Sequence, residues 1–66
     1  MEVILYSTHC PRCEVLEEKL KSKGIEYIEE NSVEVMQTKG IMSVPVLEYN
    51  GELLDFVNAV KLINSL

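Results

Sequence analysis

The two cysteines of this chain stand three positions apart, in the segment Cys10-Pro11-Arg12-Cys13, and its 66 residues include no others. A disulfide between them would close almost no loop, so it would constrain the unfolded chain very little. The disulfide-scaffold class is therefore excluded, and the chain must bury a hydrophobic core of its own. The composition allows this, since 47% of the residues are hydrophobic and only 26% are charged. At this length we expect a single domain, residues 1–66.

Charge and hydropathy narrow the class of partner. The formal net charge of −5 argues against binding to a nucleic-acid backbone, which needs clustered lysine and arginine. No apolar run approaches the roughly 18 residues of a membrane span. An acid, Glu2, stands where a signal peptide would carry a basic segment. We therefore expect a cytoplasmic monomer, in a compartment where a close cysteine pair is more often catalytic or metal-binding than structural.

Proline and glycine divide the first half of the chain into a strand, a helix and a strand. Residues 2–6 form a short apolar run that reads as a buried strand. The next element is predicted as a helix over about 11–23, because Pro11 suits a first helical turn and Gly24 a C-terminal cap. Residues 25–29 are predicted as the second strand. This order predicts a right-handed crossover between parallel strands.

The second half is predicted to add a short helix, a hairpin and a final helix. Asn31 or Ser32 can cap the short helix, which should run to about residue 39. Asn50-Gly51 is a strong signal for a two-residue turn between strands at about 44–49 and 52–54. Asp55 then caps the last helix. The order β-α-β-α-β-β-α predicts an α/β fold with a four-stranded mixed sheet flanked by three helices.

The cysteine motif lies where a strand ends and a helix begins. A helix N-terminus carries a partial positive charge, which stabilises a thiolate and lowers the thiol pKa below its free value of about 8.5. Arg12 adds a full positive charge, and His9 adds another when protonated. Cys10 is predicted to be the exposed attacking thiol, and Cys13, on the apolar face of the helix, the buried resolving thiol.

A metal or iron–sulfur site is the competing interpretation of the same residues. A zinc site needs four ligands, and only His9, Cys10 and Cys13 are evident, so Glu14 or a second chain would have to complete the shell. Haem attachment requires histidine directly after the second cysteine, and that position is Glu14. We therefore assign no metal ligands from the sequence and favour redox chemistry.

The segment Ser43-Val44-Pro45 is the second unusual feature. Proline donates no hydrogen bond to a sheet and is disfavoured within a central strand. Either a cis Val44–Pro45 bond or an ordinary trans proline at the start of a strand would explain it.

Three segments together form one pattern: Tyr6-Ser7-Thr8-His9-Cys10-Pro11-Arg12-Cys13, Ser43-Val44-Pro45-Val46-Leu47 and Asn50-Gly51. This pattern resembles the glutaredoxin branch of the thioredoxin-fold family. The resemblance implies a thioredoxin-like, glutaredoxin-type fold and a dithiol oxidoreductase that reduces protein disulfides. It also implies that the Val44–Pro45 bond is cis and faces the cysteines, with the Val44 backbone pairing with substrate. The substrate-binding residues expected around Cys10 are His9, Pro11, Arg12, Ser43, Val44 and Pro45.

The sequence departs from the glutaredoxin pattern at the positions that hold glutathione. No lysine precedes the first cysteine, and the Gly-Gly-x-Asp turn of glutaredoxins is replaced by Glu52-Leu53-Leu54-Asp55, where leucine side chains obstruct close backbone approach. Asp55 is the one glutathione contact that the resemblance retains. The chain is in this respect similar to small redoxins that draw electrons from thioredoxin reductase, with glutathione as the alternative donor. No cofactor is expected beyond the Cys10–Cys13 disulfide.

Acidic residues cluster around the second predicted strand. This cluster is predicted to be a solvated edge that favours basic protein surfaces, and its members are Glu26, Glu29, Glu30 and Glu34.

Overall fold

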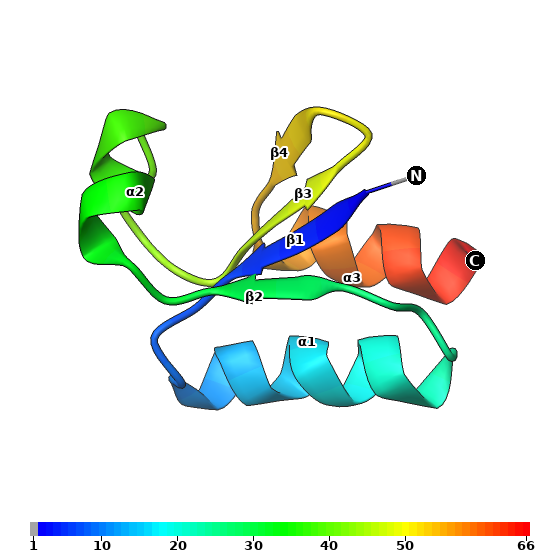
Figure 1. Cartoon of the computed structure of the whole chain (residues 1–66). Coiled ribbons are helices and arrows are strands. Elements are labelled where there is room, and N and C mark those ends of the chain that lie inside the picture. Colours follow the sequence, from blue (N-terminus) through cyan, green and yellow to red (C-terminus); the bar gives the residue numbers. More distant parts are fainter. Residues whose placement is uncertain (1) are drawn as a thin grey trace.

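The computed structural model describes residues 2–66 and contains the seven elements in the predicted order (Figure 1). They are β1 (Val3–Tyr6), α1 (Pro11–Ser22), β2 (Ile28–Glu30), α2 (Val33–Thr38), β3 (Val46–Tyr49), β4 (Glu52–Leu54) and α3 (Phe56–Ser65). The predicted α/β fold with a four-stranded mixed sheet and three helices is confirmed. Within residues 2–66, none of the helices has the length and hydropathy needed to cross a membrane.

The sheet has the strand order β2-β1-β3-β4. Strand β1 pairs in parallel with β2, as a crossover through α1 requires, and antiparallel with β3. Strand β2 starts later than predicted, at Ile28 instead of residue 25. The reason is local: the N–H of Ile25 donates to the carbonyl of Leu20 over 3.0 Å, so the chain is still closing α1 there. Strand β3 also starts later, at Val46, directly after Pro45.

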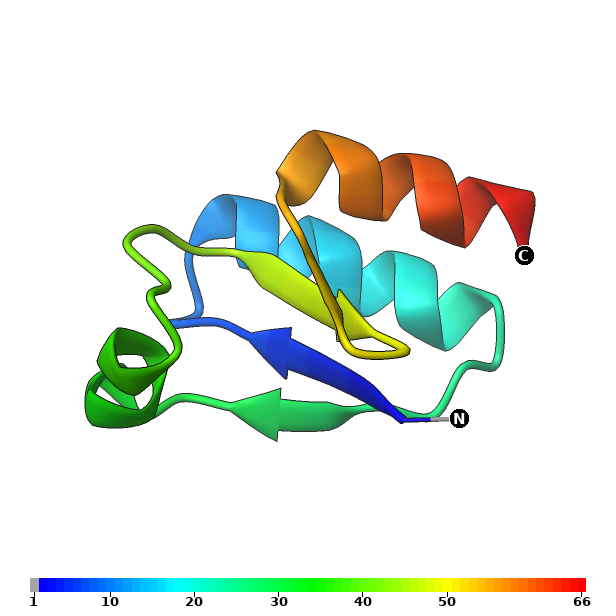
Figure 2. The same cartoon turned by 90° about the horizontal axis from the view of Figure 1, so that it is seen from above.

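Alternating side chains of β1 feed two hydrophobic clusters on opposite faces of the sheet. Helices α1 and α3 pack side by side on one face (Figure 2). The cluster between them and the sheet consists of Val3, Leu5, Leu16, Leu20, Leu47, Ala59 and Ile63. The smaller cluster on the other face holds α2 through Met36, Ile41 and Tyr6. The period-two alternation of a strand thus explains how four residues serve both layers.

Turns and caps follow the predicted chemistry. Asn50 and Gly51 have φ values of 55° and 86°, as a type I′ turn requires. Asp55 caps α3 by accepting the N–H of Asn58 over 2.9 Å. Helix α2 is capped by Ser32 and not by Asn31, whose amide is used elsewhere. Leu66, the C-cap of α3, is exposed.

Candidate functional site

The cysteine pair lies at the junction between β1 and α1. Cys10 is the N-cap of α1, and its sulfur accepts the backbone N–H of Cys13 over 3.2 Å. The two sulfurs form a disulfide, with the Cα atoms 5.0 Å apart. The carbonyl of Cys10 accepts the N–H of Glu14, which starts the helical ladder. One sulfur therefore serves both as the helix cap and as half of the disulfide.

The two cysteines differ in burial, as the sequence predicts. Cys13 is 0% exposed, beneath the first turn of α1, whereas Cys10 is half-buried at the surface. Pro11 and Arg12 between them are exposed. An incoming disulfide therefore has access to Cys10 and not to Cys13. A Cys-x-x-Cys pair at disulfide distance is compatible with a redox role.

Arg12 is directed toward the third helix. Its guanidinium carbon lies 5.5 Å from the ring centroid of Phe56, within cation–π range. Phe56 is the first residue of α3, so this contact links the cysteine loop to the start of the last helix. This contact holds the positive charge of Arg12 beside the first turn of α1.

The Val44-Pro45 segment leads into β3 at the same end of the strands as the cysteine loop. Tyr6 at the end of β1 is opposite Val46 at the start of antiparallel β3, so the segment after β1 and the segment before β3 leave the sheet side by side (Figure 2). The Val44–Pro45 peptide bond is cis, Pro45 is buried and Val44 is half-buried. Ser43 is exposed.

Met42 adds an apolar surface to this segment. Its side chain is 94% exposed, although methionine is usually buried. A flexible, polarisable side chain of this kind suits contact with varied partner surfaces.

The side chain of His9 is 65% exposed, and one edge of its ring contacts Glu29 of the second strand. The backbone of His9 is left-handed, with φ 62°, and its Nε2 is 3.4 Å from Oε2 of Glu29. The same carboxylate oxygen accepts the Ser7 hydroxyl over 3.2 Å and the Asn31 amide over 3.0 Å. These contacts, the Asn31 amide foremost, lower the pKa of Glu29.

Glu29 is therefore an exception to the predicted solvated acidic edge. It pairs in register with Leu5, whose side chain enters the cluster beneath α1, so Glu29 is directed toward α1. There it meets Glu17, and burial followed by the charge of Glu29 raises the pKa of Glu17. Sequence reasoning missed this cluster because it placed the acids of the second strand at exposed positions. Neighbouring residues of a strand face opposite sides of the sheet, and only the pairing of Glu29 with Leu5 shows that Glu29 is on the side of α1. The alternation of Glu29 with Ile28 is the one signal that was available.

Asp55 and Tyr6 both make structural contacts. The Asp55 carboxylate is engaged as the cap of α3. Tyr6 is buried, and its hydroxyl donates to Oε1 of Glu48 over 2.8 Å. Lys39, at the end of α2, lies 3.5 Å from the same oxygen.

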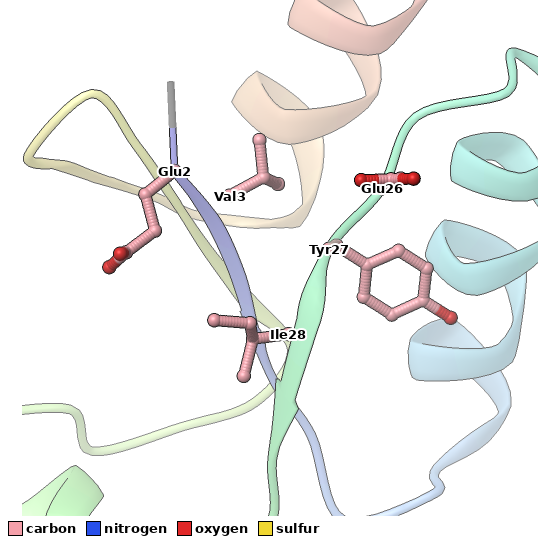
Figure 3. Close-up of a pocket in the computed structure, with 5 residues that line it drawn as sticks. All are labelled: Glu2, Val3, Glu26, Tyr27 and Ile28. Atoms are coloured by element: carbon pink, nitrogen blue, oxygen red, sulfur yellow. The ribbon is translucent and has the colours of Figure 1, made fainter.

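A shallow pocket lies at the other end of the sheet. Glu2, Val3, Glu26, Tyr27 and Ile28 line it, around the start of β1 and the approach to β2 (Figure 3). Because β1 runs from this pocket toward the cysteine loop, the pocket does not adjoin the Cys10–Cys13 pair. We assign it no part in the candidate site.

No protein-family model matches this chain, and a search of curated proteins finds no match. The function is therefore argued from the geometry of the cysteine pair and its surroundings.

Proposed function

We propose that the chain is a small thiol–disulfide oxidoreductase with a thioredoxin-like fold of glutaredoxin type. The observation that carries the proposal is the position of Cys10: its half-buried sulfur caps α1 and is bonded to a fully buried partner, Cys13. A disulfide that closes so short a loop contributes little to stability, which leaves a redox role as its best explanation.

The local electrostatics support Cys10 as the nucleophile. After reduction, its sulfur would face the N–H of Cys13 and the positive end of the α1 dipole, both of which favour the thiolate. The Arg12 guanidinium lies beside the same helical turn. Cys13 is fully buried and has no access to solvent.

The proposed reaction is a two-electron exchange in two steps. The Cys10 thiolate attacks one sulfur of a substrate disulfide, a mixed disulfide forms, and the other substrate sulfur leaves as a thiolate that takes a proton from water. Cys13 then loses its proton and attacks the Cys10 sulfur. The Cys10–Cys13 disulfide forms and the second substrate thiolate leaves. The substrate is reduced by two electrons, and an external reductant must reduce the Cys10–Cys13 pair again.

The residues around Cys10 are the proposed substrate surface. Ser43 and Val44 precede β3 where the chain runs beside the cysteine loop, and the backbone of Val44 is our candidate to pair with an extended substrate segment. His9, Pro11 and Arg12 are the exposed sequence neighbours of Cys10 in this surface. Pro45, which follows Val44, is buried.

Thioredoxin reductase is the proposed electron donor, and glutathione is the alternative. Glu52-Leu53-Leu54-Asp55 stands where glutaredoxins have a Gly-Gly-x-Asp turn, Leu53 is exposed, and the Asp55 carboxylate is occupied by the N–H of Asn58. A glutathione molecule would have to displace that cap. The metal-module alternative has less support, because the cysteine sulfurs bond to each other and His9 contacts Glu29.

An activity assay with two reducing systems tests the proposal. One supplies NADPH and thioredoxin reductase, and the other NADPH, glutathione and glutathione reductase, with insulin as the disulfide substrate. We expect faster turnover in the first system and none above background for Cys10→Ser in either. Wild-type turnover by Cys10→Ser would refute the oxidoreductase assignment, whereas faster turnover with glutathione would refute only the choice of donor.

A further inference from the structure

Three side chains that offer metal ligands converge beside the cysteine loop. They are His9 from the loop before α1, Glu17 from α1 and Glu29 from β2, and one ligand atom of each lies within 4.8 Å of the others. The set combines one imidazole nitrogen with two carboxylate oxygens, so it is not merely an acidic patch. Neither cysteine of the redox pair belongs to this set.

The separations are close to those of a bound zinc ion. Tetrahedral zinc with bonds of about 2.0–2.2 Å holds its ligand atoms roughly 3.3–3.6 Å apart. His9 Nε2 and Glu29 Oε2 are already 3.4 Å apart. The remaining separations need to close by about 1 Å, and the His9 side chain, 65% exposed, has the freedom to adjust.

The fold brings the two carboxylates together, and the charge of Lys21 reaches Glu17 only from outside ion-pair distance. Within residues 2–66, no lysine or arginine forms an ion pair with Glu17 or Glu29, and the one cationic neighbour at bonding distance is His9, which is charged only when protonated. Two carboxylates this close repel each other whenever both are charged. A divalent cation would remove this repulsion.

Glu29 is also held in the way that metal ligands are held. The hydroxyl of Ser7, a fully buried residue, and the amide of Asn31 both donate to its Oε2. Asn31 is anchored in turn by donating to the Ser7 carbonyl over 2.9 Å. Outer hydrogen bonds of this kind orient ligating carboxylates and restrict their motion.

The ligand chemistry selects among the common divalent ions. Calcium takes six to eight oxygen ligands and magnesium a nearly octahedral oxygen shell, and three side chains with one nitrogen suit neither. Imidazole with carboxylate suits zinc, which accepts three protein ligands and a water.

We propose that His9, Glu17 and Glu29 bind one zinc ion per chain. The site needs neither cysteine, because its three ligands converge while Cys10 and Cys13 are joined as a disulfide, and it shares only His9 with the proposed substrate surface.

Calorimetric titration of the oxidised protein with zinc sulfate, without reductant, tests the site while the thiols cannot bind metal. We expect one zinc per chain. The zinc affinity should fall by about tenfold or more in each of Glu29→Gln, Glu17→Gln and His9→Gln. Glu18→Gln is the matched control: Glu18 is an exposed neighbour on α1 and its loss changes the net charge equally, so binding should stay within about twofold. About a hundredfold excess of magnesium should not displace the zinc.

The opposite pattern would overturn the site. An absence of zinc binding up to about 1 mM, or equal weakening by Glu18→Gln and Glu29→Gln, would show that there is no specific site. Amide NMR spectra of each variant establish that it is folded. They also provide a second readout, since zinc should shift the resonances of Ser7 and Asn31 in the wild type. If those resonances stay unchanged while zinc binds, the ion lies elsewhere and the proposal is wrong.

Discussion

The backbone N–H of Cys13 donates a hydrogen bond to the sulfur of Cys10 over 3.2 Å, across the first turn of α1. In most helices a serine, threonine, asparagine or aspartate side chain at the N-cap accepts this bond. Here a cysteine sulfur takes the same position, so the group that caps the helix is also the group proposed to attack the substrate. Local folding and the proposed chemistry therefore depend on one atom.

The burial difference between the cysteines predicts unequal reactivity. In the reduced protein at neutral pH, we expect iodoacetamide to modify Cys10 at least about ten times faster than Cys13, because the helix N-terminus favours its thiolate and Cys13 is fully buried. Mass spectrometry of peptides from a time course measures both rates. Equal rates, or faster labelling of Cys13, would contradict this assignment of roles.

The core beneath α1 is predicted to depend on Leu16. This side chain is fully buried between the sheet and α3, so Leu16→Ala should lower the free energy of unfolding by about 2–5 kcal/mol. Val15→Ala is the control, since Val15 is 41% exposed on the same helix and its truncation should cost about 0.5 kcal/mol or less. Urea denaturation measures both, and similar losses would place the core elsewhere.

The hairpin turn is predicted to require glycine at only one of its two positions. Gly51 has φ 86° and open space around the place of a Cβ, so Gly51→Ala should cost about 1–2 kcal/mol from backbone strain alone. Asn50→Gly should be nearly neutral, because glycine also adopts the left-handed conformation seen at Asn50. If thermal or urea unfolding shows no loss for Gly51→Ala, the turn differs from type I′.

The Tyr6–Glu48 hydrogen bond predicts a loss of stability at alkaline pH. Burial, and then the bond to Glu48, raises the pKa of Tyr6 above 10.0, and the bond to Tyr6, followed by the charge of Glu48, raises the pKa of Lys39 above 10.5. The folded state therefore favours the neutral phenol and the charged amine. Both contributions are complete below these ordinary values and disappear as pH rises through the raised ones.

Tyr6→Phe should lower stability at pH 7 by about 0.5–1.5 kcal/mol and reduce the slope of stability against pH above about pH 10. Some slope should remain, because burial also raises the pKa of Tyr27. Urea denaturation at several alkaline pH values measures the slope. An identical slope in Tyr6→Phe and wild type would show that Tyr6 does not titrate in this range.

Much of the fold follows from local sequence signals. Pro11, Gly24, Asn50-Gly51 and Asp55 mark element ends through their own backbone preferences, so their positions could be predicted without knowledge of tertiary packing. The predicted start of β2 lies three residues too early, because the closing bond of α1, from the Ile25 N–H to the Leu20 carbonyl, extends one residue past the Gly24 cap.

One part of the candidate site could also be predicted from local sequence signals, and the other part could not. The placement of Cys10 and Cys13 at a helix start follows from a motif of four consecutive residues. The meeting of His9, Glu17 and Glu29 requires the left-handed backbone at His9 and the pairing of Leu5 with Glu29, neither of which has a local signature. Sequence reasoning therefore grouped His9 with the cysteines as a possible ligand set, whereas the structure directs it toward two glutamates.

The central claim is that Cys10 attacks and Cys13 resolves, and a trapping experiment tests it most directly. Reduced Cys13→Ser and Cys10→Ser proteins are each mixed with an excess of a model disulfide substrate, and the products are examined by intact mass spectrometry without reductant. We predict that Cys13→Ser accumulates a stable mixed disulfide through Cys10, because no second thiol remains to release the substrate. Cys10→Ser should remain largely unmodified, since Cys13 is buried. Accumulation of the mixed disulfide on Cys10→Ser, with none on Cys13→Ser, would contradict the account.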